Sequence, residues 1–315
     1  MPRQPGRSDD TAIFIFGVQA DRQALQALCD RTLNIRDAHG RPVHPDIEYL
    51  VVSPVVFLLF MKMERICSTH PQDSHKGLLR EKELNVAIPL LVLERIAGVM
   101  LPTRMVWYMP YLWIDAGVAM ASGRETFGFP KTMAQLTIPP AFGDPAVFAV
   151  EAEVWDPDHT SPPGRQLPIV NVRRIGGGNI ESAIPVADFA QFTSGLFQWL
   201  QLPALAQPFL SFASWFDNTR FVFLKQFRDH TNGDDACYQA IVEVPVGYPG
   251  FHGAHWLAGA YEAELFHYAS TPLAGELGFA GANPAGTVAT QQTLFAGLIN
   301  IDFVLGNGQT IWVAP

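Results

Sequence analysis

The sequence predicts an α+β protein built on a closed or cone-like antiparallel β-barrel with a few flanking helices. Short apolar or alternating runs, which are typical of strands, recur along the chain of 315 residues, whereas few stretches have helical spacing. Hydrophobic residues make up 48% of the chain and charged residues 16%, which is enough apolar surface for a large core. No repeat or linker divides the chain, so we predict one domain over residues 1–315.

The first part of the chain is expected to contain two strand regions and one helix. Ala12–Val18 is a continuous apolar run, as in a buried strand. Asp21 is suited to cap a helix, and the leucines after it keep helical spacing. Tyr49–Met63 is a second β-rich run, in which Pro54 indicates an edge position or a bulge. The polar segment Ser68–Glu83 is predicted to be a surface loop or a short helix.

The rest of the chain is predicted to be mostly strands. One amphipathic helix is expected over Ala187–Leu202, which carries aromatic and leucine residues on one face. Asn307–Gly308 is a turn signal and predicts a terminal hairpin between Ile301–Leu305 and Thr310–Val313. Further strands are expected at Val86–Glu94, Met105–Leu112, Val118–Ser122, Ala134–Ile138, Ala146–Val154, Phe221–Gln226, Tyr238–Val246, Trp256–Phe266 and Gly297–Leu305.

Composition argues against several classes of function. The formal net charge of −9 disfavours a nucleic-acid partner, which needs a basic surface. Met1–Asp10 lacks the apolar core of a signal peptide, and the longest apolar runs, Leu50–Met61 and Val86–Leu93, are too short to cross a bilayer. Three cysteines without a C-x-x-C pair favour a reducing compartment. We therefore expect a soluble cytoplasmic protein with no membrane partner.

The stretch Gly123–Lys131 carries the clearest chemical signal, because it ends on an isolated lysine in apolar surroundings. The chain has only five lysines. An amine attacks a carbonyl only when it is neutral, and a free lysine has a pKa of about 10.4. Desolvation can lower a lysine pKa by up to about 3–5 units. Lys131 is therefore expected to be a buried amine of low pKa that forms a Schiff base; an ordinary surface lysine is the alternative.

Two other groups of residues could suggest binding sites. The glycine-rich run Arg174–Gly178 lacks the spacing of a phosphate-binding loop and is interpreted as a turn. His252, His255 and His267 could contact a metal, but nothing in their spacing brings three or four ligands together. We expect neither a metal nor a cofactor.

The run Ala119–Glu125, followed by Phe129–Pro130–Lys131, resembles the signature of the acetoacetate decarboxylase family. In that family the lysine after the proline forms the imine, and acetoacetate decarboxylase is itself the known example of a lysine activated in this way. Weaker similarity at Val92–Arg95 and Glu264–Leu273 extends the resemblance over most of the chain. It implies a barrel-shaped carbon–carbon lyase that acts on a keto acid without a cofactor, and we also expect a homo-oligomer. Against the family pattern, residues 68–83 are a surface insertion.

The resemblance also suggests a second catalytic residue. Glu94 lies near the place of the family's active-site glutamate. In a strand it points away from Arg95, so it is expected to face the same cavity as Lys131. A salt bridge from Glu94 to Arg95 or Arg104 is the structural alternative.

Other residues near the lysine are expected to support the site. Arg124, Glu125 and Pro130 are expected to hold the lysine turn, as they do in the family. Contacts with the substrate are expected from Arg104, Phe129 and Thr132.

Two departures from the family pattern leave the reaction open. Thr132 stands where the decarboxylases carry a second lysine, and the first strand lacks their arginine, for which Arg3, Arg7 and Arg104 are the candidates. Decarboxylation of a β-keto acid is expected. An imine-dependent aldolase or dehydratase acting on an α-keto acid such as pyruvate is an alternative, as is a non-catalytic ligand-binding barrel. The departures favour a larger, more apolar substrate than acetoacetate.

Overall fold

The computed structural model describes residues 3–140, 144–155, 163–177, 183–204, 206, 219–279 and 286–314. The helices in these ranges are α1 (Arg22–Thr32), α2 (Gly117–Phe127), α3 (Phe189–Trp199) and α5 (Leu273–Glu276). The strands are β1 (Gly6–Gln19), β2 (Ile47–Val51), β3 (Val55–Ser68), β4 (Leu79–Ile96), β5 (Val99–Ile114), β6 (Lys131–Thr137), β7 (Val147–Val154), β8 (Arg165–Arg174), β9 (Ile184–Val186), β10 (Arg220–Arg228), β11 (Ala236–Trp256), β12 (Tyr261–His267), β13 (Thr287–Gln292), β14 (Phe295–Leu305) and β15 (Gln309–Val313).

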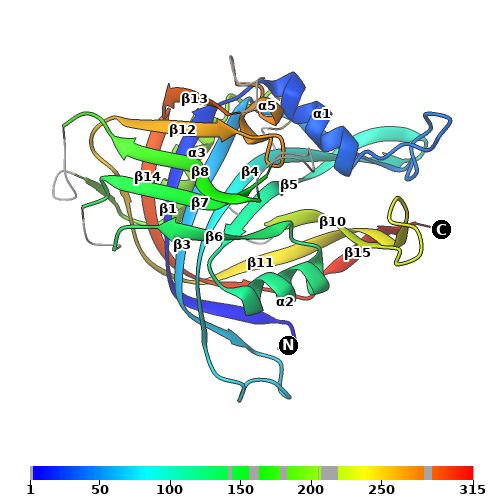
Figure 1. The fold of residues 1–315 in the computed structure, drawn as a ribbon, viewed down its shortest axis with the longest axis horizontal. Coiled ribbons are helices and arrows are strands. Elements are labelled where there is room, and N and C mark those ends of the chain that lie inside the picture. The colour runs from blue at the N-terminus through cyan, green and yellow to red at the C-terminus, as the bar shows by residue number, and fades with distance from the viewer. Residues whose placement is uncertain are drawn as a thin grey trace.

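Some of these strands form a ring of hydrogen-bonded neighbours, in the order β1, β3, β4, β5, β10, β11 and β14 (Figure 1). The pairings are antiparallel except between β5 and β10, which run parallel and are joined by only two residue pairs. The predicted α+β class with few helices is therefore confirmed. A closed antiparallel barrel is not confirmed, because the ring depends on this short parallel link.

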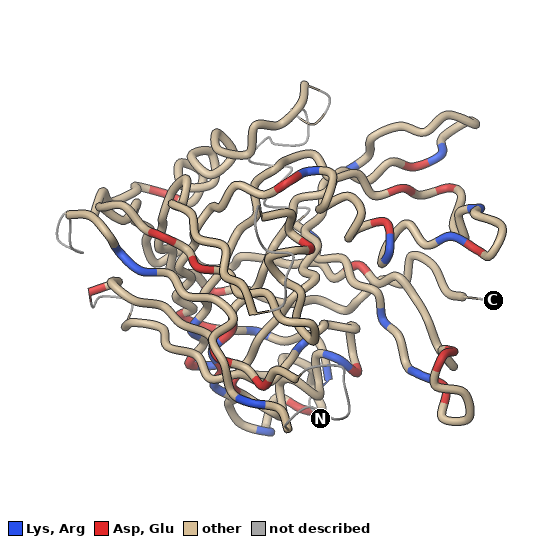
Figure 2. Tube along the Cα trace, turned by 45° about the horizontal axis from the view of Figure 1, so that its top comes forward, with Lys and Arg blue, Asp and Glu red and all other residues tan. Residues whose placement is uncertain are grey.

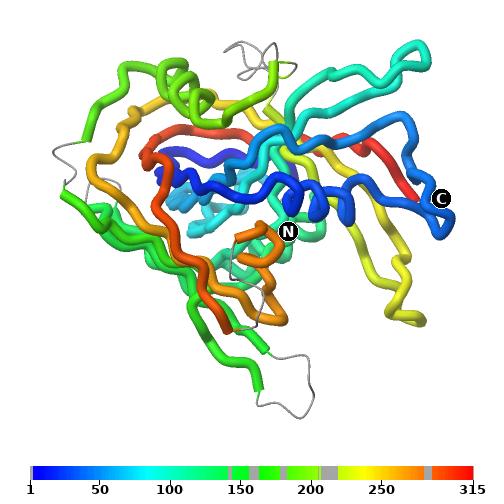
Figure 3. Tube along the Cα trace, turned by 90° about the horizontal axis from the view of Figure 1, so that it is seen from above, coloured from blue at the N-terminus to red at the C-terminus, as the bar shows by residue number. Residues whose placement is uncertain are grey.

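A second group of strands extends from the ring at β5. The end of β5 pairs in parallel with β6, and β7, β8, β12 and β13 follow in that order. We call these five strands the wing. Figure 1 shows the wing crossing in front of β1 and β3, and the view from above (Figure 3) shows β7 and β8 reaching beyond the ring at one end. The wing and the ring thus form two layers that meet at β6.

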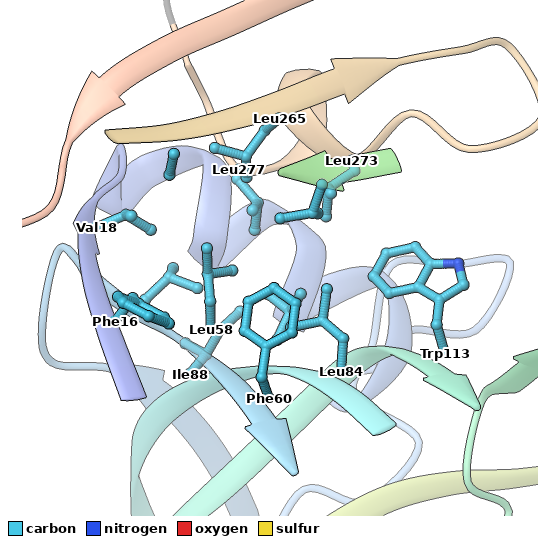
Figure 4. Packing of buried hydrophobic residues seen from close by; sticks show 14 of the residues in the cluster. Phe16, Val18, Leu58, Phe60, Leu84, Ile88, Trp113, Leu265, Leu273 and Leu277 are labelled. Carbon is cyan, nitrogen blue, oxygen red and sulfur yellow. The ribbon is translucent and has the colours of Figure 1, made fainter. Parts of the chain in front are cut away.

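Two apolar cores result from this arrangement, and β1 contributes to both. Phe14 and Phe16 face the first core, between the ring and the wing, where the rings of Phe16 and Phe148 of β7 lie 4.9 Å apart. Figure 4 shows part of this core. Ile13 and Ile15 face the second core, together with residues of the other ring strands and of α3. Because successive side chains of a strand point to opposite faces, a strand buried on both faces needs the continuous apolar run seen in the sequence.

Most of the predicted elements are confirmed, with differences at their ends. The side chain of Asp21 caps α1 by accepting a hydrogen bond from the backbone N–H of Ala24, at 2.8 Å. The predicted strand Tyr49–Met63 is divided at Pro54 into β2 and β3. The predicted helix is shorter than expected and forms α3. The predicted strand Trp256–Phe266 is likewise interrupted, before β12 begins at Tyr261.

Two predicted elements are wrong. The segment Val118–Ser122 is part of helix α2 rather than a strand; its small residues suit a helix, which ends at Gly128 in the left-handed conformation. The terminal hairpin does not form, because β15 pairs with β11. β14 pairs with the second half of β11 and β15 with its first half, so the turn at Asn307 carries the chain onward along the same edge.

The polar segment 68–83 proves to be two different structures. Residues 69–78 connect β3 to β4, but β4 already begins at Leu79. Glu81 and Glu83 are buried, so the last part of the segment is not on the surface.

No helix in the described ranges is long and apolar enough to span a membrane. Figure 2 shows acidic and basic residues interspersed along the described chain.

Candidate active site

The turn between α2 and β6 positions Lys131 at the start of β6. Gly128 ends the helix with a φ of 79°, a conformation that favours glycine. A Cβ at Gly128 would lie only 2.4 Å from the Cα of Lys225, so glycine also permits this close approach. The chain then enters β6, where Lys131 pairs with Leu112 of β5. The Gly-Phe-Pro-Lys sequence thus fixes the lysine at the place where the ring and the wing meet.

The side chain of Lys131 runs along α2. A Cβ at Gly123 would lie 3.1 Å from Cδ and 3.2 Å from Cε of Lys131, which is close enough to displace the lysine. Arg124 donates a hydrogen bond from Nη1 to the carbonyl oxygen of Lys131, at 3.4 Å. Arg124 therefore contacts the lysine backbone, although its side chain is otherwise exposed.

Two glutamates of β4 face the amine of Lys131. Lys131 Nζ forms an ion pair with Glu83 Oε1 and lies 3.7 Å from Glu81 Oε1. Lys131 and Glu83 are each 5% exposed and Glu81 is 7% exposed. Asn85, two residues further along the same face, donates a hydrogen bond to Glu83 Oε2 at 3.4 Å. Within the described part of the chain, Glu81 Oε2 is buried and has no hydrogen-bond partner.

The carboxylates determine the protonation state of this cluster. Burial lowers the pKa of Lys131, but the negative charges of Glu83 and Glu81 outweigh burial and raise the pKa above its usual value. This corrects the expectation of a low lysine pKa. Burial and the charge of Glu83 raise the pKa of Glu81 to about 8. At neutral pH the cluster therefore combines a charged Lys131 amine with a protonated Glu81.

The amine opens on a largely apolar cavity of about 150 Å³. We call it the apolar chamber; its walls come from ring strands and from α3. Typical lining residues are Ile13, Phe57, Met109, Phe192, Val246 and Ile299. Phe129 also lines the chamber, and its ring centre lies 5.5 Å from Lys131 Nζ.

A second cavity of about 120 Å³ also reaches Lys131 and Glu81. We call it the cationic chamber, because Arg3, Arg7 and Lys76 line it. Arg7 contacts Asp9 through Nε and Asp302 through Nη2, the latter at 3.3 Å, which leaves Nη1 outside these two ion pairs. Of the three arginines considered as replacements for the family's arginine, Arg3 and Arg7 thus line a cavity that also reaches Lys131.

Glu94 and Arg104 do not join this site. Glu94 lies eleven residues after Glu83 on β4, which corresponds to roughly 35 Å along the strand. It forms an ion pair with Arg104, which also binds buried Glu243 at 2.6 Å. The salt bridge considered as the structural alternative is therefore the one observed. Strand alternation correctly separates Glu94 from Arg95, but it does not tell which end of a long strand approaches the lysine.

The other predicted residues lie at the edge of the site. Thr132 is exposed and, as the next residue of β6, points away from the chambers. Glu125 and Pro130 are also exposed. Of the residues expected to catalyse, to support the lysine turn or to contact the substrate, only Lys131 and Phe129 line a described chamber.

The sequence also contains a pattern that indicates the buried position of Glu81 and Glu83. Glu81, Glu83 and Asn85 occupy every second position at the start of an apolar strand, which places them on one face. Lys82 between them points elsewhere and donates to the carbonyl oxygen of Leu136 at 3.3 Å. The mixed charges of the preceding segment made these glutamates resemble surface residues.

In the ranges that the structure describes, no group of three or more His, Cys, Asp or Glu residues could hold a metal.

Comparisons with known proteins agree with this geometry. The family model described as acetoacetate decarboxylase matches residues 1–175. A crystal structure of acetoacetate decarboxylase from Legionella pneumophila is 14% identical, with a TM-score of 0.59, over 99% of this chain and 89% of that one. The enduracididine biosynthesis enzyme MppR, complexed with pyruvate, is also 14% identical, with a TM-score of 0.54, over 99% and 91% of the two chains. These structures share the fold. No curated protein matches the sequence.

Proposed function

The chain belongs to the acetoacetate decarboxylase family, and from that premise we propose that it is a Schiff-base-forming lyase that decarboxylates a β-keto acid through Lys131. The observation that carries this proposal is the buried contact of the lysine amine with two carboxylates at an apolar chamber. An enzyme that forms an imine needs an amine, a group that accepts and returns its proton, and a site that excludes water.

The first step is formation of the imine. Glu83 accepts a proton from the Lys131 ammonium, and the neutral amine attacks the ketone carbon of the substrate. Glu83 then returns this proton to the hydroxyl group of the carbinolamine, which leaves as water and yields a protonated imine. The raised lysine pKa makes this proton transfer a necessary step, and Glu83 is the acceptor in contact with the amine.

The second step breaks the carbon–carbon bond. The electron pair of the bond to the carboxylate moves toward the imine nitrogen, so that CO₂ leaves and an enamine forms. Glu81 then donates its proton to the enamine carbon, a role supported by its raised pKa and by its unpartnered buried oxygen. Hydrolysis of the imine releases a ketone and restores Lys131. Overall, the reaction consumes one proton and releases one CO₂.

Arg7 is proposed to bind the substrate carboxylate from the cationic chamber. A charge-assisted hydrogen bond contributes about 1.5–3 kcal/mol. Arg7 lines the cavity that reaches Lys131, and its Nη1 takes part in neither the Asp9 nor the Asp302 ion pair, which supports this role.

An imine-dependent aldolase or dehydratase acting on an α-keto acid is the second candidate. The shared fold with MppR, whose structure contains pyruvate, favours it. This reaction uses the same first step, but the carbanion forms by loss of a proton instead of CO₂.

Borohydride reduction in the presence of keto acids tests the proposal. Acetoacetate, longer β-keto acids and pyruvate are each incubated with the protein and borohydride, and the adduct is located by peptide mass spectrometry. We expect an adduct on Lys131, no adduct in Lys131→Ala, and release of CO₂ from β-keto acids. Adducts with pyruvate and no CO₂ from any β-keto acid would favour the aldolase or dehydratase. The absence of every adduct would favour a non-catalytic protein.

We also propose that the protein functions as a cytoplasmic homo-oligomer whose partner is the small-molecule keto acid. The cysteine pattern supports the reducing compartment in this proposal. Light scattering of the purified protein tests the oligomeric state; a monomeric mass would contradict it.

A further inference from the structure

We propose that the substrate carries a bulky apolar group on its ketone carbon, of about the size of a phenyl ring or a pentyl chain, and that the apolar chamber holds this group. The inference rests on the proposed function, since it concerns the substrate of the same lysine. It differs from the proposed function in what it predicts: a dependence of imine formation on the size of the apolar group.

The size of the chamber supports this inference. The chamber has a volume of about 150 Å³. An apolar cavity of about this volume accommodates a benzene molecule. Acetoacetate has only a methyl group on the ketone carbon and would leave most of the chamber unfilled. A substrate that fills the chamber gains about 0.8 kcal/mol for each methylene group that it buries.

Most of the lining offers no hydrogen-bond partner to a polar group. Glu81, Glu83 and Lys131 contact one another. Asn85 adjoins this cluster: it donates to Glu83, and its Oδ1 is buried without a hydrogen-bond partner among the described residues. Thr193 donates its hydroxyl hydrogen within α3, to the carbonyl oxygen of Phe189 at 3.0 Å or of Ala190 at 3.1 Å. A polar substituent in the remaining, apolar part of the chamber would lose its hydrogen bonds to water without replacement. Burying an unpaired polar group in this way costs roughly 2–7 kcal/mol.

The two chambers also orient the substrate. Lys131, Glu81 and Phe129 line both chambers, so a ketone carbon at Lys131 Nζ adjoins both the apolar chamber and the chamber that Arg3 and Arg7 line. A β-keto acid carries its carboxylate and its variable group on opposite sides of the ketone. With the carboxylate toward Arg7, the variable group enters the apolar chamber.

Methyl ketones of increasing length test the inference without requiring decarboxylation. They are the products of the proposed reaction and form the same imine. We expect the efficiency of borohydride trapping to rise about fourfold for each added methylene, until the chamber is filled at pentyl or phenyl size. The values of kcat/KM for CO₂ release from the corresponding β-keto acids should follow the same order.

Variants that fill the chamber provide the matched comparison. Val246→Phe places a larger side chain in the chamber wall and should move the optimum to shorter chains. Leu196→Phe also fills the chamber, from helix α3, and serves as the second variant if Val246→Phe does not fold. Val288→Phe is the matched control, because Val288 on β13 is 46% exposed and lines neither chamber. It should keep the chain-length profile of the parent.

The outcomes separate the two proposals. Trapping on Lys131 that is equal for all chain lengths, or that is best with acetone and acetoacetate, would overturn the inference and leave the proposed function intact. A profile that stays the same in both chamber-filling variants would also overturn it. Absence of trapping with every ketone and keto acid would remove the proposed function itself.

Discussion

At the scale of single residues, the central feature is a lysine whose charge is stabilised rather than suppressed. The apolar surroundings of Lys131 alone would favour a neutral amine. The two carboxylates on β4 reverse this effect, because an opposite charge at close range outweighs desolvation. The reactive state therefore depends on a proton transfer inside the cluster.

Replacing Glu83 by Gln tests this dependence. Loss of the adjacent negative charge should lower the pKa of Lys131, so the pH midpoint of its reaction with an amine reagent should move down. Loss of the proton acceptor should also reduce the maximal turnover rate, by about 10²-fold or more. Reactivity and steady-state rates measured over a pH series report both effects. An unchanged midpoint would contradict the assignment of Glu83 as the partner of the amine.

Glu94→Gln is the matched variant on the same strand. Glu94 contacts Arg104 far from the amine, so turnover should stay within about twofold of the parent. The ion pair is partly exposed and its loss should lower the free energy of unfolding by about 1 kcal/mol or less. Turnover and denaturant unfolding are measured on one preparation. A large loss of turnover in a stable protein would return Glu94 to the catalytic residues.

At the scale of elements, the turn from α2 to β6 determines where the lysine lies. The helix stops because Gly128 adopts a positive φ, and the strand starts three residues later. The close packing of Gly128 against Lys225 of β10 fixes this turn to the ring.

Gly128→Ala should therefore affect both stability and activity. A left-handed non-glycine residue costs about 1–2 kcal/mol, and contact of the new Cβ with the Lys225 backbone adds to this cost. Gly40→Ala is the control: Gly40 has a similar φ of 75°, but a Cβ there meets nothing within 4 Å.

Unfolding and trapping assays compare the two variants. Both should be less stable than the parent, Gly128→Ala more so, and only Gly128→Ala should lose Lys131 trapping. Equal behaviour of the two variants would show that the contact with Lys225 does not position the lysine.

At the scale of the whole molecule, the protonated Glu81 couples folding to pH. Its pKa is about 8 in the folded protein and has an ordinary value of 4.5. Between these values the folded state binds more protons than the unfolded state, so this residue lowers the free energy of unfolding as the pH rises from about 4.5 to 8. Lys131 affects the free energy of unfolding in a different pH range, because a raised lysine pKa contributes stability that is lost only at alkaline pH.

Glu81→Gln should remove this part of the pH dependence. Relative to the parent, the variant should gain stability as the pH rises from 5 to 8, by up to about 1.4 kcal/mol per pH unit and less where the cluster shares the proton. Denaturant unfolding of both proteins at several pH values measures the difference. A constant difference across this range would contradict the raised pKa.

The sequence by itself determined the secondary-structure class, most of the strands, the capped helix α1 and the lysine that we propose forms the imine, because these depend on local patterns. Apolar runs, the Asp21 cap and the Gly-Phe-Pro-Lys turn each need only neighbouring residues. The tertiary structure decided which carboxylate meets the amine. Glu81, Glu83 and Glu94 lie on one strand, and only its register against β3 and β5, together with the parallel pairing of β5 and β6, brings Glu83 to Lys131 and leaves Glu94 with Arg104. Strand register depends on contacts between distant residues, so the periodicity of one strand cannot specify it.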